Sequence, residues 1–190
     1  MARTQAEDYG EKRAAIVEEA AKLFAARGFD GASLADLAYA CDMSKSLFYH
    51  YYPSKESILY AVMAKHMDDL LTAVEDAKAD APPEDLRAFA RRLLRLYAGA
   101  AAKQKVLLYE LSNLPDSQRD EIIAKERRLT AHVENLIGKA RPLTDKARLK
   151  AQTMLFFGMI NWTHTWLKPG GAVNRDQVAD MAAKMALAEV

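Results

Sequence analysis

The sequence predicts an all-α protein with a small N-terminal helical domain and a larger C-terminal one. Apolar residues recur at helical spacing along most of the 190 residues, and no segment requires a strand. The six prolines fall at or near the ends of these periodic segments, where helices are expected to begin or end. We therefore expect a three-helix domain over residues 1–54 and a helical domain over residues 55–190.

The first helix is expected from about Tyr9 to Arg27, after a loose polar segment of about ten residues. Its apolar face carries Ile16, Ala20, Leu23 and Phe24. Gly28 follows as a helix-ending residue, because glycine accepts the left-handed backbone that often closes a helix.

Two short helices joined by a tight turn are expected over residues 33–52. Ser33 can cap the first helix, with Asp36 in a capping box, and Ser44 can cap the second after the break at Asp42. Pro53 stops the second helix, and Ser54 caps the next. This arrangement is a helix-turn-helix unit, whose second helix enters the major groove of DNA.

The second helix of this unit has side chains suited to DNA, because hydrogen-bond donors, a ring hydroxyl and one apolar group crowd a short segment. Lys55 begins the following helix, whose N-terminal N–H groups favour a phosphate. The candidate DNA contacts are Ser33, Ser44, Lys45, Ser46, Leu47, Tyr49, His50 and Lys55.

The segment SKSLFYHYYPSKE resembles the recognition helix and following turn of the TetR family of transcriptional repressors. In the family pattern, Phe48, Tyr49, Tyr52 and Lys55 stand at the positions of Leu, Tyr, Phe and Lys. Asp42 replaces the usual turn glycine, but aspartate tolerates a left-handed conformation better than most residues. The resemblance implies a DNA-binding repressor, with Ser46 and Leu47 departing from the family at base-facing positions.

The net charge of the first 60 residues argues against DNA binding, because seven Lys or Arg stand against nine Asp or Glu. Between Met43 and Lys55, however, there are two lysines and no acid. Few phosphate contacts per subunit are therefore expected, and binding should depend on a dimer.

The C-terminal part is expected to contain helices over about 54–80, 84–102, 103–111, 115–141 and 145–167, and a last helix capped by Asn174. Thr144 can cap the fifth of these. Polar and aromatic residues on their apolar faces have two readings, ordinary packing or a cavity for a small ligand. The candidate ligand residues are Met63, Met67, Leu70, Tyr97, Tyr109, Glu110, Asn113, Phe156, Asn161 and Trp162.

The segment GMINWTHTWLKPGG resembles, more weakly, the corresponding helix of TetR-like regulators that sense acyl-CoA thioesters or other fatty or aromatic metabolites. Arg91-Arg92 and Arg127-Arg128 are either phosphate ligands for such an effector or a solvated helix face.

The helix around Met154–Trp166 is apolar on nearly all sides, so one face can serve the core and another a partner subunit. Its exposed surface is larger than a single subunit needs, which predicts a homodimer. The candidate interface residues are Met154, Phe157, Ile160, Trp166, Met181 and Met185.

Several classes of function are disfavoured. The four histidines are scattered, so no metal or other cofactor is expected, and no phosphate loop or nucleophile elbow indicates an enzyme. No apolar run is long enough to span a membrane, there is no secretory signal, and the single cysteine fits a cytoplasmic protein. The leading hypothesis is a ligand-responsive repressor that binds a palindromic operator. The rival is a helical small-molecule-binding protein or enzyme without specific DNA binding.

Overall fold

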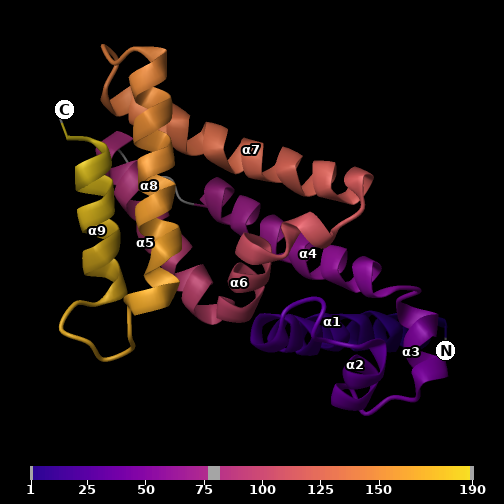
Figure 1. The fold of residues 1–190 in the computed structure, drawn as a ribbon. Helices are drawn as coiled ribbons and strands as arrows, with labels where there is room; N and C mark the ends of the chain where they lie inside the picture. Colours follow the sequence, from indigo (N-terminus) through magenta and orange to yellow (C-terminus); the bar gives the residue numbers. More distant parts are fainter. Residues whose placement is uncertain (1, 77–81, 189–190) are drawn as a thin grey trace. The chain divides into compact units, whose positions relative to one another are not determined.

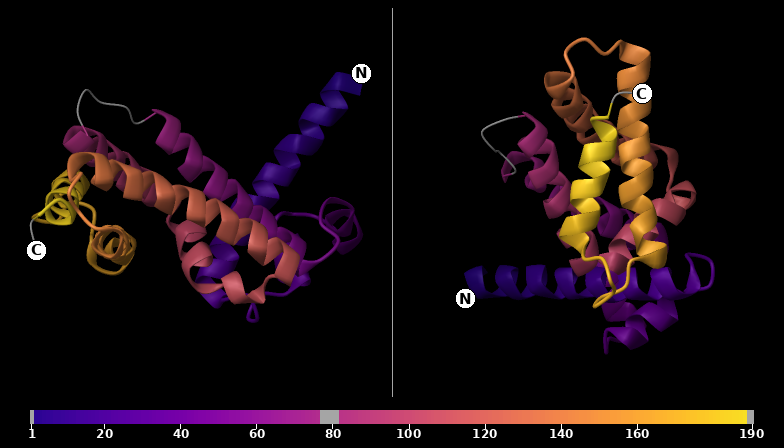
Figure 2. Two further views of the ribbon diagram at one scale, coloured as in Figure 1. Left: turned by 90° about the horizontal axis from the view of Figure 1, so that it is seen from above. Right: turned by 90° about the vertical axis from the view of Figure 1, so that its left-hand side faces the viewer.

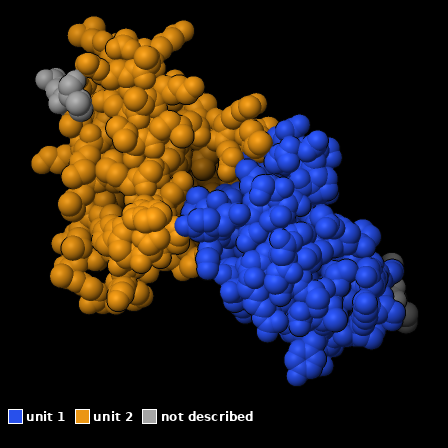
Figure 3. Space-filling model, viewed as in Figure 1, with its two compact units in different colours: residues 1–66, 102–122 blue, residues 67–101, 123–190 orange. Residues whose placement is uncertain are grey.

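The computed structural model describes residues 2–76 and 82–188, and this part of the chain is helical without strands (Figure 1). The chain divides into two compact units (Figure 3). Unit 1 comprises residues 1–66 and 102–122, and unit 2 comprises residues 67–101 and 123–190. The expected division after residue 54 stays a prediction, because two long helices contribute residues to both units.

Unit 1 begins with α1 (Ala2–Arg27), α2 (Leu34–Ala40) and α3 (Lys45–Tyr51). It continues with the first turns of α4 (Lys55–Asp76), then α6 (Ala101–Tyr109), a 3₁₀ turn η1 (Leu111–Asn113) and the start of α7 (Asp116–Ala140). The expected loose N-terminus is wrong, since α1 begins at Ala2. Its first residues are mostly good helix formers, and nothing there breaks a helix.

The core of unit 1 is formed by the inward stripes of α1, α2, α3 and α4. Ile16, Ala20, Leu37, Phe48 and Ile58 are completely buried. Gly28 ends α1 as predicted, with φ of 73° and its N–H donating to the carbonyl of Phe24 at 2.8 Å. At Gly31 a Cβ would lie 2.3 Å from the carbonyl oxygen of Arg27, so only glycine fits there.

Unit 1 is also tied together by three consecutive side chains of α6. Lys103 pairs with Glu18 of α1, and Lys105 Nζ donates to the carbonyl of Ala25 at 2.7 Å. Between them, Gln104 Oε1 lies 2.7 Å from Nε2 of the buried His66 on α4. One short helix therefore holds both α1 and α4.

Unit 2 contains the remainder of α4 and α7 together with α5 (Pro82–Gly99), α8 (Lys146–Trp166) and α9 (Arg175–Ala186). The expected end of α4 at Asp80 lies outside the described residues. α5 begins at Pro82, two residues before the expected start, because proline is tolerated in a first turn. Asp145, rather than Thr144, caps α8, and Asn174 caps α9 as predicted.

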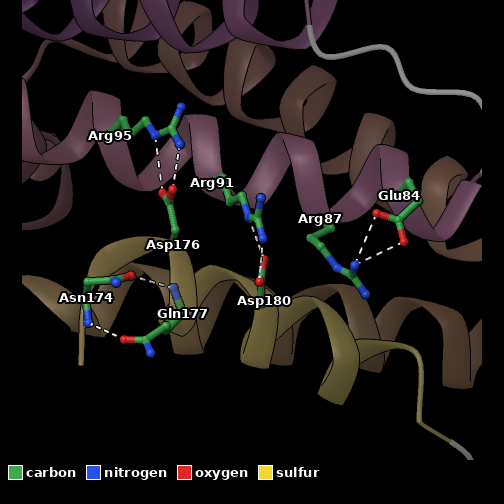
Figure 4. Close-up of polar contacts among 8 residues, drawn as sticks. All are labelled: Glu84, Arg87, Arg91, Arg95, Asn174, Asp176, Gln177 and Asp180. Carbon is green, nitrogen blue, oxygen red and sulfur yellow. Dashed lines mark hydrogen bonds and ion pairs between the residues drawn. The ribbon is translucent and has the colours of Figure 1, made fainter. Parts of the chain in front are cut away.

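Two bidentate ion pairs join α5 to α9 (Figure 4). The Arg91 guanidinium donates to both oxygens of Asp180 at 2.6 Å. One turn along, Arg95 meets Asp176 at 2.6 and 3.2 Å. The spacing of four residues on each helix matches, so these pairs fix the register of α9 on α5.

These ion pairs make the stability of unit 2 depend on pH. The arginines hold the pKa of Asp176 and Asp180 below the ordinary carboxyl value. The stabilisation is therefore present at neutral pH and is lost as pH falls through the lowered pKa values. We expect Asp180→Asn to lower the melting temperature slightly at pH 7, because the pair is partly exposed.

The difference in melting temperature between Asp180→Asn and the unmodified protein should shrink as pH falls below about 4. Asp120→Asn removes an exposed carboxylate on α7 and serves as the control, with little expected change. A difference for Asp180→Asn that stays constant down to pH about 2 would contradict an ionic role for this pair.

Candidate DNA-binding surface

The turn between α2 and α3 has the geometry of a helix-turn-helix unit. Ser33 and Asp36 form the predicted capping box, with the Ser33 N–H donating to Asp36 at 2.9 Å and the Asp36 N–H donating to Ser33 Oγ at 3.1 Å. The hydroxyl and the N–H of Ser33 both donate to the Asp36 carboxylate and lower its pKa, the hydroxyl contributing most. Asp42 adopts φ of 52°, so aspartate does take the left-handed position that the sequence suggested.

The helix α3 begins at its predicted cap. Ser44 Oγ accepts a hydrogen bond from the N–H of Leu47 at 3.2 Å and lies 3.2 Å from the hydroxyl of Ser46. Phe48 and Tyr51 point into unit 1 and are buried. The opposite side of the helix is exposed and carries the five residues expected to reach DNA, Lys45, Ser46, Leu47, Tyr49 and His50.

Leu47 and Tyr49 are each 43% exposed although both are largely apolar. Their exposure has a physical cause, since a seven-residue helix can turn only one narrow face inward. Because donors, a phenol and an aliphatic group are presented together, this surface can form hydrogen bonds with base edges and also contact a thymine methyl.

Lys55 makes a contact within unit 1 that the sequence did not predict. Its Nζ donates to the carbonyl oxygen of Phe29 at 2.8 Å and lies 4.1 Å from the centre of the Phe29 ring. The ammonium therefore closes the turn between α1 and α2, and its expected contact with a DNA phosphate stays a prediction. The N-terminus of α4 itself is capped by Ser54, whose Oγ accepts the N–H of Ser57 at 3.1 Å.

Ser33 likewise uses its hydroxyl within unit 1, since Oγ donates to Asp36 at 2.6 Å. Tyr39 on α2 was not among the candidate DNA contacts predicted from the sequence, although its side chain is 88% exposed. An outward tyrosine in a short helix cannot be recognised from apolar periodicity, because its spacing from Leu37 fits neither face clearly.

The candidate ligand residues do not form one cluster. In unit 2, the Tyr97 hydroxyl donates to Asn161 Oδ1 at 2.8 Å, so these two groups satisfy each other. Met67, Leu70 and Phe156 are fully buried, as ordinary core residues are. Trp162 is exposed instead, and a cavity lined by these residues stays a prediction.

In unit 1, Met63 is buried, while Asn113 donates to Glu110 Oε2 at 2.8 Å. Glu110 and Tyr109 line a hollow of about 170 Å³ beside the end of α1, and Tyr109 is exposed. In unit 2, Asp180 binds the Nε and Nη2 edge of Arg91, so this edge is not available to an effector phosphate.

An apolar groove runs between α8 and α9, which lie side by side (Figure 2). It has a volume of about 540 Å³. Its walls are almost wholly aliphatic, aromatic or sulfur-bearing, and the lining residues are Leu155, Gly158, Met159, Trp162, Trp166, Val173, Val178, Met181, Ala182 and Met185.

The candidate dimer residues divide between the two faces of α8 and α9. Met154, Trp166, Met181 and Met185 are about half exposed, as an interface requires. Phe157 and Ile160 are buried within unit 2, so their assignment to an exposed interface is wrong. Both belong to the inward stripe with Thr153 and Phe156, which the all-round apolar sequence did not distinguish.

Among the residues that the structure describes, no group of His, Cys, Asp or Glu is arranged to hold a metal ion. No helix in that part of the chain has the length and apolar character needed to span a bilayer.

The positive φ of Asp42 makes the turn sensitive to side-chain shape. Asp42→Val should destabilise the protein by about 1–2 kcal/mol, because a β-branched residue is strained in the left-handed region. Asp42→Gly should be neutral or stabilising, and urea unfolding measures both. Equal stability of the Val and Gly variants would show that the turn relaxes to another conformation.

Comparison with known proteins gives a consistent result. Residues 16–62 match the bacterial regulatory proteins of the tetR family, and residues 79–190 match the tetracyclin repressor-like C-terminal domain. The HTH-type transcriptional regulator YuxN of Bacillus subtilis is 32% identical over 145 residues, 70% of this chain. The chain spans 49% of the length of that relative.

Two solved structures cover nearly the whole chain. A TetR-family transcriptional regulator from Bordetella parapertussis is 37% identical, covers 92% of this chain and 93% of its own, and superposes with a TM-score of 0.87. AibR, solved in complex with isovaleryl coenzyme A and operator DNA, is 31% identical over 92% of this chain and 97% of its own, with a TM-score of 0.80. The turn at Asp42, the exposed face of α3 and these similarities agree, and the chain belongs to the TetR family of bacterial regulatory proteins.

Proposed function

We propose that the protein is a DNA-binding transcriptional regulator that acts as a homodimer on a palindromic operator and is released by a small-molecule effector. The exposed face of α3 is the observation that carries the DNA-binding part. Five side chains able to contact DNA stand outward on a helix whose other face is fixed in the core.

The exposed residues of α3 have separable roles. The Lys45 ammonium is a donor for guanine acceptors, and Leu47 is the apolar group that fits a thymine methyl. Tyr49 and His50 are suited to contacts with phosphate or sugar, which position the helix without reading sequence.

The charge of unit 1 also shapes this proposal. Lys55 binds the Phe29 carbonyl, which leaves few basic groups for phosphates on each subunit. Non-specific affinity is then low, and two subunits are needed for stable binding to one site.

Selection of binding sites from random duplex DNA tests the function. The protein should enrich a palindrome whose half-sites lie about one helical turn apart. Lys45→Ala and Leu47→Ala should each relax base preference at their own positions by roughly 1–3 kcal/mol. No enrichment, or binding only at very low salt, would favour the rival helical small-molecule-binding protein or enzyme.

The second part of the proposal concerns the dimer. The groove between α8 and α9 exposes two tryptophans and two methionines, more apolar surface than isolated subunits usually leave in water. The same α8–α9 surface of a second subunit would cover this groove by two-fold symmetry. The ion pairs of Arg91 and Arg95 hold α9 in register for this contact.

Trp166→Glu should convert the dimer to a monomer, because a carboxylate would be buried in the apolar groove. We expect the dimer dissociation constant to rise roughly 100-fold or more, as for central interface residues. Sedimentation velocity measures this, with Leu143→Glu as the control at a fully exposed leucine outside the groove. A Trp166→Glu protein that remains dimeric would place the interface elsewhere.

The third part concerns release from DNA. α4 carries Lys55 at its start and the buried Met63, Met67 and Leu70 further along, and it spans roughly 33 Å at the usual helical rise. Gln104 and the two lysines beside it attach α6 to α4 and α1. An effector that shifts α4 or α6 would therefore move α1 with it.

Isovaleryl coenzyme A is a suitable probe for this switch, because AibR has been solved with that molecule. Calorimetry should give a weaker affinity for the protein–operator complex than for free protein, by about 5–150-fold, because coupling between sites is reciprocal. Equal affinities would mean that this ligand does not drive release, and no binding would exclude this ligand as the effector.

A further inference from the structure

The C-terminal end of α3 is in contact with the N-terminal part of α1. The Tyr9 ring stacks on Tyr51, with centroids 4.8 Å apart and planes inclined by 24°. One helical turn later, the Arg13 guanidinium lies 4.8 Å from the centre of the Tyr52 ring. Two neighbouring positions of α1 thus hold two consecutive aromatic residues at the end of α3.

These contacts bear on a helix that has few others. A seven-residue helix is not stable alone, so packing must set its direction. Only Phe48 and Tyr51 of α3 are buried, and Tyr51 is the one nearer its C-terminal end. The Tyr9 ring therefore packs against the C-terminal end of α3 and limits the directions that this end can take.

The same tyrosine also meets the exposed DNA-binding face. The rings of Tyr9 and His50 lie 6.0 Å apart with an interplanar angle of 80°, an edge-to-face arrangement. The His50 ring meets Tyr51 in a similar way, at 5.7 Å and 79°. Three rings, two from α3 and one from α1, thus form one cluster, in which His50 is the member expected to touch DNA.

We infer that Tyr9 is a positioning residue for DNA recognition, which sets the angle of α3 through the stack on Tyr51 and the edge contact with His50. This inference rests on the proposed DNA-binding function. It assigns a role to the first turns of α1, which lie outside the residues matched by the N-terminal family domain.

The chemistry of the stack makes a sharp distinction possible. Ring stacking depends on the aromatic face and not on the hydroxyl, so phenylalanine preserves it and leucine removes it. A tyrosine that instead bound a DNA phosphate through its hydroxyl would lose that contact in both variants. Tyr9→Phe and Tyr9→Leu therefore separate positioning from direct contact.

The experiment compares three proteins, unmodified, Tyr9→Phe and Tyr9→Leu. Each is titrated with the palindromic duplex that the unmodified protein selects and with a scrambled duplex of equal composition, at one salt concentration. Thermal unfolding of each protein is measured alongside. Tyr9 is 36% exposed, so its substitution is compatible with folding.

We expect Tyr9→Leu to weaken binding to the selected duplex roughly fivefold per subunit, the size expected for loss of one aromatic pair. Its binding to the scrambled duplex should change little, and Tyr9→Phe should behave like the unmodified protein. The melting temperature of Tyr9→Leu should fall by only about 2–4 °C, because the lost pair is worth about 1 kcal/mol. Equal losses on both duplexes with a larger fall in melting temperature would show a purely structural role and overturn the inference.

Two other results would also overturn it. Unchanged binding of Tyr9→Leu to the selected duplex would leave the proposed function intact and remove only the positioning role. A Tyr9→Phe protein as weak as Tyr9→Leu would show a direct hydroxyl contact instead. Failure of the unmodified protein to select any duplex would overturn the proposed function itself and the inference with it.

Discussion

The packing of one short helix is the constraint on which the DNA-binding surface depends. With seven residues, α3 gains too little from its own hydrogen bonds to persist in water, so neighbours must hold it. Phe48 anchors it in the core, Ser44 caps its start, and Asp42 bends the chain into it through a left-handed residue. The outward face is free to carry Lys45, Leu47 and Tyr49 because none of them is needed for this packing.

A different constraint governs α8, which is apolar on nearly every side. One stripe of it, including Phe156 and Ile160, fills the core of unit 2. The other, including Trp162 and Trp166, forms the groove with α9 and stays in contact with water. Exposure of this apolar surface to water is unfavourable, and the proposed dimer would bury it. The ion pairs of Arg91 and Arg95 fix α9 so that both walls of the groove keep their spacing.

The sequence was sufficient for features that depend on local chemistry. The caps at Ser33, Ser44 and Asn174 and the turn at Asp42 are confirmed, because each follows from what one side chain can do for nearby backbone. Features that depend on long-range contacts were not predictable. The hydrogen bond from Lys55 to the carbonyl of Phe29 joins residues that are 26 positions apart. Phe157 faces inward because of the rotation of the whole helix α8 about its axis. The stack of Tyr9 on Tyr51 joins positions that no periodic pattern relates.

The central claim is that the exposed face of α3 lies against the bases of DNA. Photo-crosslinking from a benzoyl-phenylalanine placed at position 47 tests this directly, with the same group at position 143, another exposed leucine, as the control. The account predicts covalent attachment to bases within each half-site of the selected palindrome from position 47 and none from position 143. Attachment from position 143, or none from position 47 while the duplex is bound, would contradict it.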